Sequence, residues 1–129
     1  MSIMNGANFK ICDSLAVASQ GVVYSNSFLM RWVENFGIWV QATSVLSTPS
    51  LKIELQESYV PPTTEGSADT SYVVGDGVAD VYTNLNDENA HVKSLSPVPM
   101  QYGRYKITGL AANPADTIIT LVNFQQEMI

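Results

Sequence analysis

The segment Leu51-Lys52-Ile53-Glu54-Leu55-Gln56-Glu57 decides the fold. Apolar and polar residues alternate along it with a period of two, which is the spacing of side chains on the two faces of a β-strand. Leu51, Ile53 and Leu55 therefore share one face. We expect that face to lie in the core and the polar face to meet solvent or a polar partner.

The same alternation recurs in two other segments. In Arg104–Thr108 it places Tyr105 and Ile107 on one face, and in Phe36–Ala42 it leaves Trp39 alone opposite an apolar face. Period-two patterns of this length are typical of half-buried strands in antiparallel sheets. Both segments are therefore predicted to be strands with one face in the core.

A fourth segment, Asp116–Gln125, is rich in β-branched residues and is apolar on both faces. Ile118 and Val122 share one face, and Ile119 and Leu121 share the other. Since a strand with two apolar faces is normally buried on both, we expect this segment to be covered on both sides.

Weaker strand patterns and regularly placed turn residues complete the chain. The weaker strands are predicted at Phe9–Cys12, Gly21–Tyr24, Phe28–Val33, Ser71–Val74, Val78–Tyr82 and His91–Leu95. Short strands separated by turns at such intervals indicate a sandwich or jelly roll. We predict an all-β protein in which residues 1–129 form a single antiparallel β-sandwich, jelly-roll-like domain, with residues 1–8 as a candidate flexible N-terminal arm.

Composition narrows the range of functions. Hydrophobic residues make up 46% of the chain and charged residues 14%, and 12 acidic against 6 basic residues give a net charge of −6. Nucleic-acid binding and binding to anionic membranes both need a basic patch, so neither is expected. The low charge leaves a largely neutral surface, which is common in proteins that pack against other proteins.

The single cysteine, Cys12, cannot form an intrachain disulfide. No apolar stretch approaches the roughly twenty residues that span a membrane, and the first nine residues lack the pattern of a signal peptide. We therefore expect a soluble protein made in a reducing cytoplasm.

Residues with catalytic or metal-binding chemistry are few. Cys12 and His91 are the only cysteine and histidine, and Asp76, Asp80, Asp87 and Glu88 are the acidic residues around two turns. A Cys/His nucleophile site is possible in principle, but both residues also fit ordinary strand positions. The four carboxylates, with Asn84 and Asn86, are candidate calcium ligands, but their spacing is not that of an EF-hand, and we favour turn formation as their role. We expect no enzyme activity, no cofactor and no dedicated metal site.

Aromatic side chains are the remaining candidates for a binding surface. Such rings stack on the apolar faces of sugars, but they are equally frequent in cores and in protein interfaces. The candidate interface residues are Trp39, Tyr59, Tyr72, Tyr82 and Tyr102. Trp39 is either buried or an anchor at a subunit contact, and we favour a buried role.

Several segments together resemble a known group of proteins. They are Leu51–Tyr59, then Asp80-Val81-Tyr82, then Pro97–Gly109 with its Arg104-Tyr105-Lys106-Ile107-Thr108-Gly109 strand, and the turn Asn113-Pro114-Ala115-Asp116-Thr117. In this order they resemble small β-sandwich structural proteins encoded among the head genes of tailed bacteriophages. The resemblance covers the C-terminal two-thirds of the chain.

The resemblance implies a virion structural protein, with head decoration as the first hypothesis. The partners would be the major capsid protein or other virion proteins, and the protein would form a homo-oligomer, with a trimer as one candidate. It would reside in the virion head after assembly in the host bacterial cytoplasm. The alternative is a carbohydrate-binding or adhesion module of a phage tail or cell surface, since such modules share the strand pattern. The resemblance implies no catalytic residue.

Overall fold

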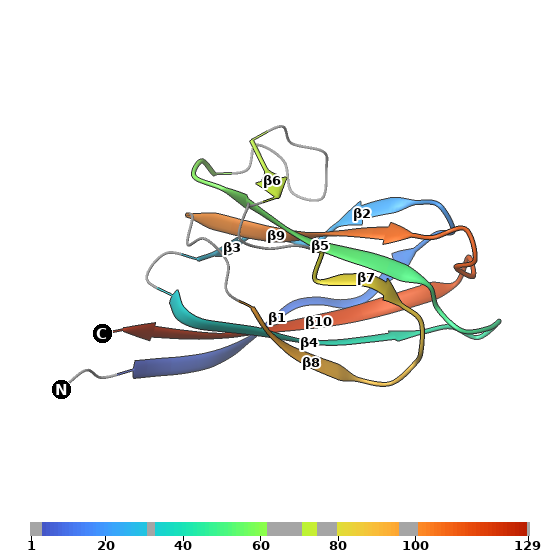
Figure 1. The fold of residues 1–129 in the computed structure, drawn as a ribbon, viewed down its shortest axis with the longest axis horizontal. Coiled ribbons are helices and arrows are strands. Elements are labelled where there is room, and N and C mark those ends of the chain that lie inside the picture. Colours follow the sequence, from blue (N-terminus) through green and yellow to red (C-terminus); the bar gives the residue numbers. More distant parts are fainter. Residues whose placement is uncertain (1–3, 31–32, 62–70, 75–79, 96–100, 129) are drawn as a thin grey trace.

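The computed structural model describes residues 4–30, 33–61, 71–74, 80–95 and 101–128. Within these residues the chain forms strands joined by turns and contains no helix, so none that could cross a membrane (Figure 1). The strands are β1 (Met4–Val17), β2 (Val22–Tyr24), β3 (Phe28–Leu29), β4 (Val33–Thr43), β5 (Leu51–Ser58), β6 (Val73–Val74), β7 (Tyr82–Leu85), β8 (His91–Leu95), β9 (Tyr102–Gly109) and β10 (Thr117–Met128).

The strands form two antiparallel sheets that lie one above the other (Figure 1). Sheet A has the order β1-β10-β4-β8. Sheet B has the order β2-β9-β5-β6, with β3 pairing also with β9 and β7 pairing also with β5. The chain passes repeatedly between the sheets, from β4 to β5 and from β8 through β9 to β10, as in a jelly roll. The predicted all-β sandwich is confirmed.

The core lies between the sheets and follows the predicted alternation. Leu51, Ile53 and Leu55 of β5 are buried, and Tyr105 and Ile107 of β9 lie beside them. Facing them from β4 is a row of buried residues, namely Phe36, Ile38, Val40 and Ala42. Burying each large apolar side chain contributes about 1.5–3 kcal/mol, which makes this alternation the main determinant of the fold.

Strand β10 differs from its prediction on one face. Ile119 and Leu121 point inward and are fully buried, as expected. On the other face Ile118 is 38% exposed and Phe124 is 43% exposed, because sheet B covers only the inner side of sheet A. The expectation that the chain itself covers both faces of this strand is therefore wrong.

The N-terminal segment, for which a flexible arm was a candidate at residues 1–8, is a strand from residue 4 onward. Residues 4–8 belong to β1, where Met4 pairs with Met128 and Asn8 pairs with Phe124. Residues 1–3 lie outside the described residues. The two ends of the chain lie close together at one end of the sandwich (Figure 1).

One strand begins later than predicted. A strand was predicted at Val78–Tyr82, but β7 begins only at Tyr82; residues 78 and 79 are not among those described.

Candidate functional site

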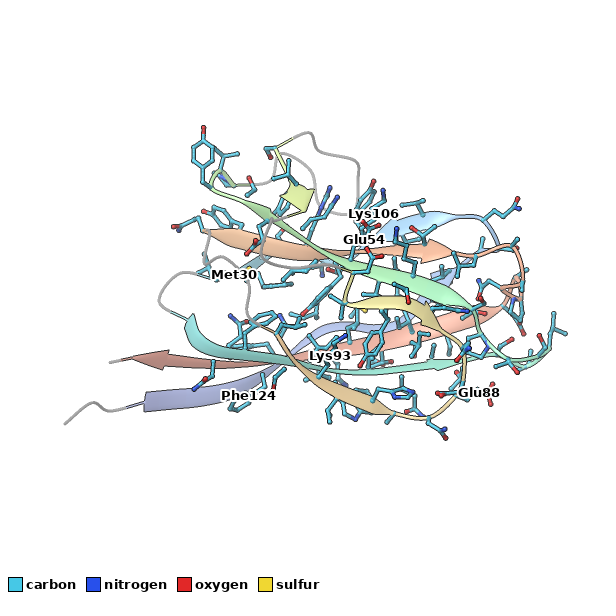
Figure 2. The ribbon with its side chains drawn as sticks, in the orientation of Figure 1. Met30, Glu54, Glu88, Lys93, Lys106 and Phe124 are labelled. Carbon is cyan, nitrogen blue, oxygen red and sulfur yellow. The ribbon has the colours of Figure 1, made fainter. Side chains whose placement is uncertain are left out.

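The outer face of sheet A is uncharged over β10, β4 and β8 and carries a cluster of apolar side chains at its centre. We use this name for the outward side chains of three of its four strands: Asn35, Trp39, Gln41 and Thr43 from β4; Ile118, Thr120, Val122 and Phe124 from β10; and Val92 and Ser94 from β8. Val92 is 76% exposed. Figure 2 shows Phe124 on the side of sheet A away from sheet B, whereas Glu54 and Lys106 lie on the opposite side of the molecule. Lys10 and Asp13 lie at the β1 edge of this face, where Lys10 pairs with Val122 and the Asp13 carboxylate accepts a hydrogen bond from the Thr120 hydroxyl (3.4 Å).

A groove crosses this face at Gly37. This glycine pairs with Phe124 on one side and with Ser94 on the other, and its missing side chain leaves a hollow between them. The groove has a volume of about 510 Å³ and is lined further by Trp39, Val92 and Val122. Trp39 is half-buried, so the favoured buried role holds only in part. The hollow is suited to an apolar group of a few ring or branched-chain atoms.

A second apolar surface is the loop after β4, at the end of the sandwich. Val45 is 89% exposed and Leu46 is 72% exposed. Asp116 fixes the backbone beneath them, since its carboxylate accepts hydrogen bonds from the Ser44 hydroxyl (2.9 Å) and from the Val45 amide (3.2 Å). The Glu88 carboxylate accepts a third, from the Ser44 amide (2.9 Å). We call the two exposed residues the Val45–Leu46 tip; they are presented on a loop held by charge-assisted hydrogen bonds.

The outer face of sheet B holds a buried cation. The Arg104 guanidinium lies between two aromatic rings, 4.1 Å from the Tyr24 centroid and 4.4 Å from the Tyr72 centroid. Its Nε donates to the Gln56 side-chain oxygen (2.9 Å), and the Tyr72 hydroxyl donates to the Ser27 hydroxyl (2.8 Å). Arginine stacks on rings through its planar guanidinium, so this stack binds β2, β9 and the segment of Tyr72 together.

Replacing Arg104 with lysine should lower the free energy of unfolding by about 1–2 kcal/mol, because an ammonium keeps the charge but loses the planar stack and the Nε hydrogen bond. Urea unfolding monitored by circular dichroism measures the loss. The matched control is Lys106→Arg, on the same face of the same strand, which should stay within about 0.5 kcal/mol of the wild type. Equal stabilities of the two variants would contradict the stacking role.

Glu57 is a buried carboxylic acid at the end of the core. It continues the inward row of Leu51, Ile53 and Leu55 and is 2% exposed. One carboxylate oxygen, Oε1, has no hydrogen-bond partner in the described structure, and burial raises the pKa of Glu57 from 4.5 to about 7. The period-two pattern could have located this residue, since its parity places it inside. Arg104 had no such signal, because the rings that bury it come from distant parts of the sequence.

The Cys12 and His91 side chains do not form a catalytic pair. Cys12 lies on β1 and His91 on β8, the two opposite edges of sheet A, with β10 and β4 between them. At about 4.8 Å per strand, the two backbones are roughly 14 Å apart. Burial raises the pKa of the Cys12 thiol to about 11, which keeps it protonated near neutral pH. His91 Nε2 instead lies 2.7 Å from Asp87 Oδ1, and this hydrogen bond lowers the pKa of Asp87.

The candidate calcium ligands have separate protein partners. Asp80 lies 3.7 Å from the Lys52 ammonium, Asp87 hydrogen-bonds His91 and the Asn89 amide, and Glu88 accepts from Ser44. Asp76 lies outside the described residues. Among the residues that are described, no three histidine, cysteine or acidic side chains gather as a metal site would require.

The five candidate interface aromatics are dispersed over the molecule. Trp39 is on the outer face of sheet A, and Tyr72 is buried against Arg104. Tyr82 is half-buried, with the Lys93 ammonium 5.1 Å from its ring centroid. Tyr59 is exposed just after β5, whose last residue pairs with the half-buried Tyr102. They form no common aromatic patch. Phe124, which the sequence did not single out, is the aromatic residue that joins Trp39 at the groove.

Comparisons with known proteins define the class of fold. No protein-family model and no curated protein matches the sequence. Among solved structures, the SPBc2 prophage-derived protein YomS is 10% identical and covers 98% of this chain and 97% of its own, with a TM-score of 0.55. A mitogen from Yersinia pseudotuberculosis is 9% identical over 97% of this chain and 86% of its own, with a TM-score of 0.42. The carbohydrate-binding module CBM36, solved with calcium and xylotriose, is 13% identical over 95% and 92%, with a TM-score of 0.40. The chain therefore shares its β-sandwich fold, over nearly its whole length, with a prophage-derived protein.

Proposed function

We propose that this protein is a structural component of a tailed-phage virion, acting as a head decoration protein through contacts with other virion proteins. The observation that carries the proposal is the Val45–Leu46 tip. Val45 and Leu46 are adjacent, large and apolar, and a hydrogen-bonded loop holds both of them out in water. Pre-organised apolar anchors of this kind contribute strongly to protein interfaces, because little conformational entropy is lost on binding.

Two further features support a virion role. The sequence segments around β5, β9 and the Asn113–Thr117 turn resemble phage head proteins, and the fold is shared with a prophage-derived protein. The turn is held against the rest of the sandwich by hydrogen bonds. The Asn113 side chain donates one to the Val17 carbonyl (3.1 Å) and accepts one from the Ser50 amide (3.3 Å). A rigid sandwich with a fixed contact loop suits a protein that adds to a completed shell.

The test is the copy number of the protein in purified particles from its source, measured by quantitative mass spectrometry. A decoration protein should be present at on the order of hundreds of copies per particle, as the symmetry of a shell requires. A few copies would place it at the neck or tail instead. Complete absence from particles would overturn the virion role.

Incorporation should depend on the tip. The double variant Val45→Ser with Leu46→Ser removes both apolar side chains at largely exposed positions, so the fold should be retained. We expect its copy number to fall at least tenfold relative to the wild type, because interface anchors carry about 2 kcal/mol or more each. The matched control is Val73→Ser, an exposed apolar residue on β6 in sheet B. Equal incorporation of the double variant and the wild type would rule out the tip as the contact.

The alternative function, carbohydrate binding, has one observation in its favour. Trp39 and Phe124 flank the groove at Gly37, as aromatic rings flank many sugar sites. The polar residues that line the groove are Ser94 and Lys93, and the Lys93 ammonium is turned inward to the Val81 carbonyl (2.7 Å). Sugars need several hydrogen bonds in addition to stacking, so the groove suits an apolar occupant better. Saturable quenching of tryptophan fluorescence by oligosaccharides would restore the alternative.

A further inference from the structure

We infer that the outer face of sheet A is the contact surface for a second copy of this chain, packed face to face about a two-fold axis. This inference does not depend on the virion role, since it concerns the purified protein alone. It rests on the residues of the face, their charge, their shape and the area that they offer.

The first observation is that β10 is built for burial on two sides. Its outward residues Ile118, Val122 and Phe124 are as apolar as its inward ones, yet the chain covers only the inward face. Beside them, Val92 of β8 stands exposed next to the half-buried Trp39, with which it pairs. An apolar sheet face of this extent is characteristic of a surface that another protein covers.

The second observation is the charge distribution, which identifies the occupant. The chain carries a net charge of −6, so two copies repel each other over most of their surfaces. The outward side chains of β4, β10 and β8 that form this face are all uncharged. At its rim, Lys10 of β1 forms an ion pair with Asp13 (3.4 Å), so the two charges cancel. Through this face two acidic copies can therefore meet without bringing their negative charges together. The same face offers no unpaired charge that would attract a strongly charged partner.

The third observation is shape. The hollow at Gly37 lies directly beside the projecting Phe124, its partner in the β4–β10 ladder. In an isologous pair the same patch meets itself, so a projection next to a hollow becomes complementary across the axis. Phe124 of each copy would enter the groove of the other, between Trp39 and Val92. Sheets stacked in this way lie about 10 Å apart and cross at about 30°.

The available area sets the strength of the association. With strands about 4.8 Å apart and a rise of about 3.4 Å per residue, the face and the adjoining edge strand β1 together span roughly 500 Å² over eight residues. Two copies would bury roughly 1,000 Å², which is near the lower limit for a specific interface. We therefore expect a dimer with a Kd on the order of 10–100 μM, which becomes dominant where copies are concentrated.

Sedimentation velocity of the purified full chain, from about 5 μM to about 500 μM, brackets that range. The wild type should pass from monomer to dimer. Val92→Lys and Phe124→Lys should each raise the Kd at least tenfold, because each places a charge in both halves of an apolar contact. The control Val22→Lys, at an exposed position on β2 of sheet B, should leave the Kd unchanged. Circular dichroism of each variant verifies the fold.

Two outcomes would overturn the inference. One is a wild type that stays monomeric throughout the concentration range. The other is an association that Val22→Lys weakens and the two sheet A variants do not, which would move the interface to sheet B. Neither outcome depends on the particle copy number, so the dimer and the virion role can fail separately.

Discussion

Replacing Gly109 with alanine is expected to lower the free energy of unfolding by about 3 kcal/mol, the upper part of the range for overpacked sites. In thermal unfolding this corresponds to a decrease in Tm of about 10 °C for a domain of this size. Gly109 ends β9 where that strand crosses the turn between β1 and β2, and its amide donates to the Gly21 carbonyl (2.8 Å).

The cause of this effect is a backbone contact that leaves no room for a side chain. A Cβ atom at position 109 would lie 2.1 Å from the Ala18 carbonyl oxygen and 3.1 Å from Asn113 Nδ2. The Ala18 carbonyl cannot move freely, because it accepts the Gly21 amide hydrogen bond (3.0 Å) that closes the turn. Asn113 is equally constrained by its bonds to Val17 and Ser50. The strain therefore spreads to three chain segments.

The matched control for this substitution is Gly37→Ala. It makes the same chemical change within a strand, but the nearest atom to the new Cβ is the Lys93 carbonyl oxygen at 3.1 Å. We expect the control to change the free energy of unfolding by no more than about 1 kcal/mol. Both variants are compared by urea unfolding at low protein concentration, where self-association is negligible. Equal losses would show that the contact at Ala18 relaxes and would contradict the prediction.

The sequence predicted the parts of the fold that depend on local alternation. The inward rows of β5 and β9 are where the period of two places them, because burial of every second side chain leaves a direct trace in the sequence. Long-range pairing leaves no such trace. The bulges of β1 after Lys10 and Cys12, and the pairing of its first residues with the end of β10, come from contacts more than a hundred residues apart.

The candidate sites were predicted less well, for a physical reason. Tyr72 is one of the candidate interface residues, and its ring is buried against the Arg104 guanidinium, which also stacks on Tyr24. Val45 and Leu46, the exposed residues on which the proposed virion contact rests, lie in a short apolar stretch that resembles the end of a strand in sequence. Whether such residues are buried depends on which element packs over them, and a single sequence does not record that.

Glu57 should make the protein less stable as the pH rises from about 4.5 to about 7. Burial raises the pKa of Glu57 from 4.5 in the unfolded chain to about 7 in the folded protein. Between these values the folded state binds more protons than the unfolded state, so the free energy of unfolding falls with increasing pH. The full contribution of Glu57 to the free energy of unfolding is present below about pH 4.5, and it is lost as the pH rises through 7. The shift corresponds to on the order of 3 kcal/mol.

The surroundings of Glu57 explain why the neutral acid is preferred. Gly103 of β9 and Val73 of β6 are its partners across the sheet, and the next inward side chain on β9 is the buried Tyr105, whose hydroxyl is already committed to Asn123 Oδ1 (2.5 Å). Arg104 and Gln56 project from the opposite face of the sheet. Among the described residues, no charge therefore compensates the ionised carboxylate, and its Oε1 atom lacks a donor there.

The decisive variant is Glu57→Gln, which keeps the shape of the side chain and removes its titration. The free energy of unfolding of this variant should not show the decline that Glu57 causes in the wild type between pH 5 and pH 8. At pH 8 the variant should be more stable than the wild type by up to about 3 kcal/mol. Urea unfolding at each integral pH measures both quantities. Glu54→Gln, on the outer face of the same strand, is the matched control and should retain the decline that Glu57 produces. A wild type and a Glu57→Gln variant with parallel pH profiles would mean that the carboxylate is already compensated when ionised. The inward end of β5 would then be a site where charge is tolerated, since a donor from elsewhere in the chain must reach Oε1.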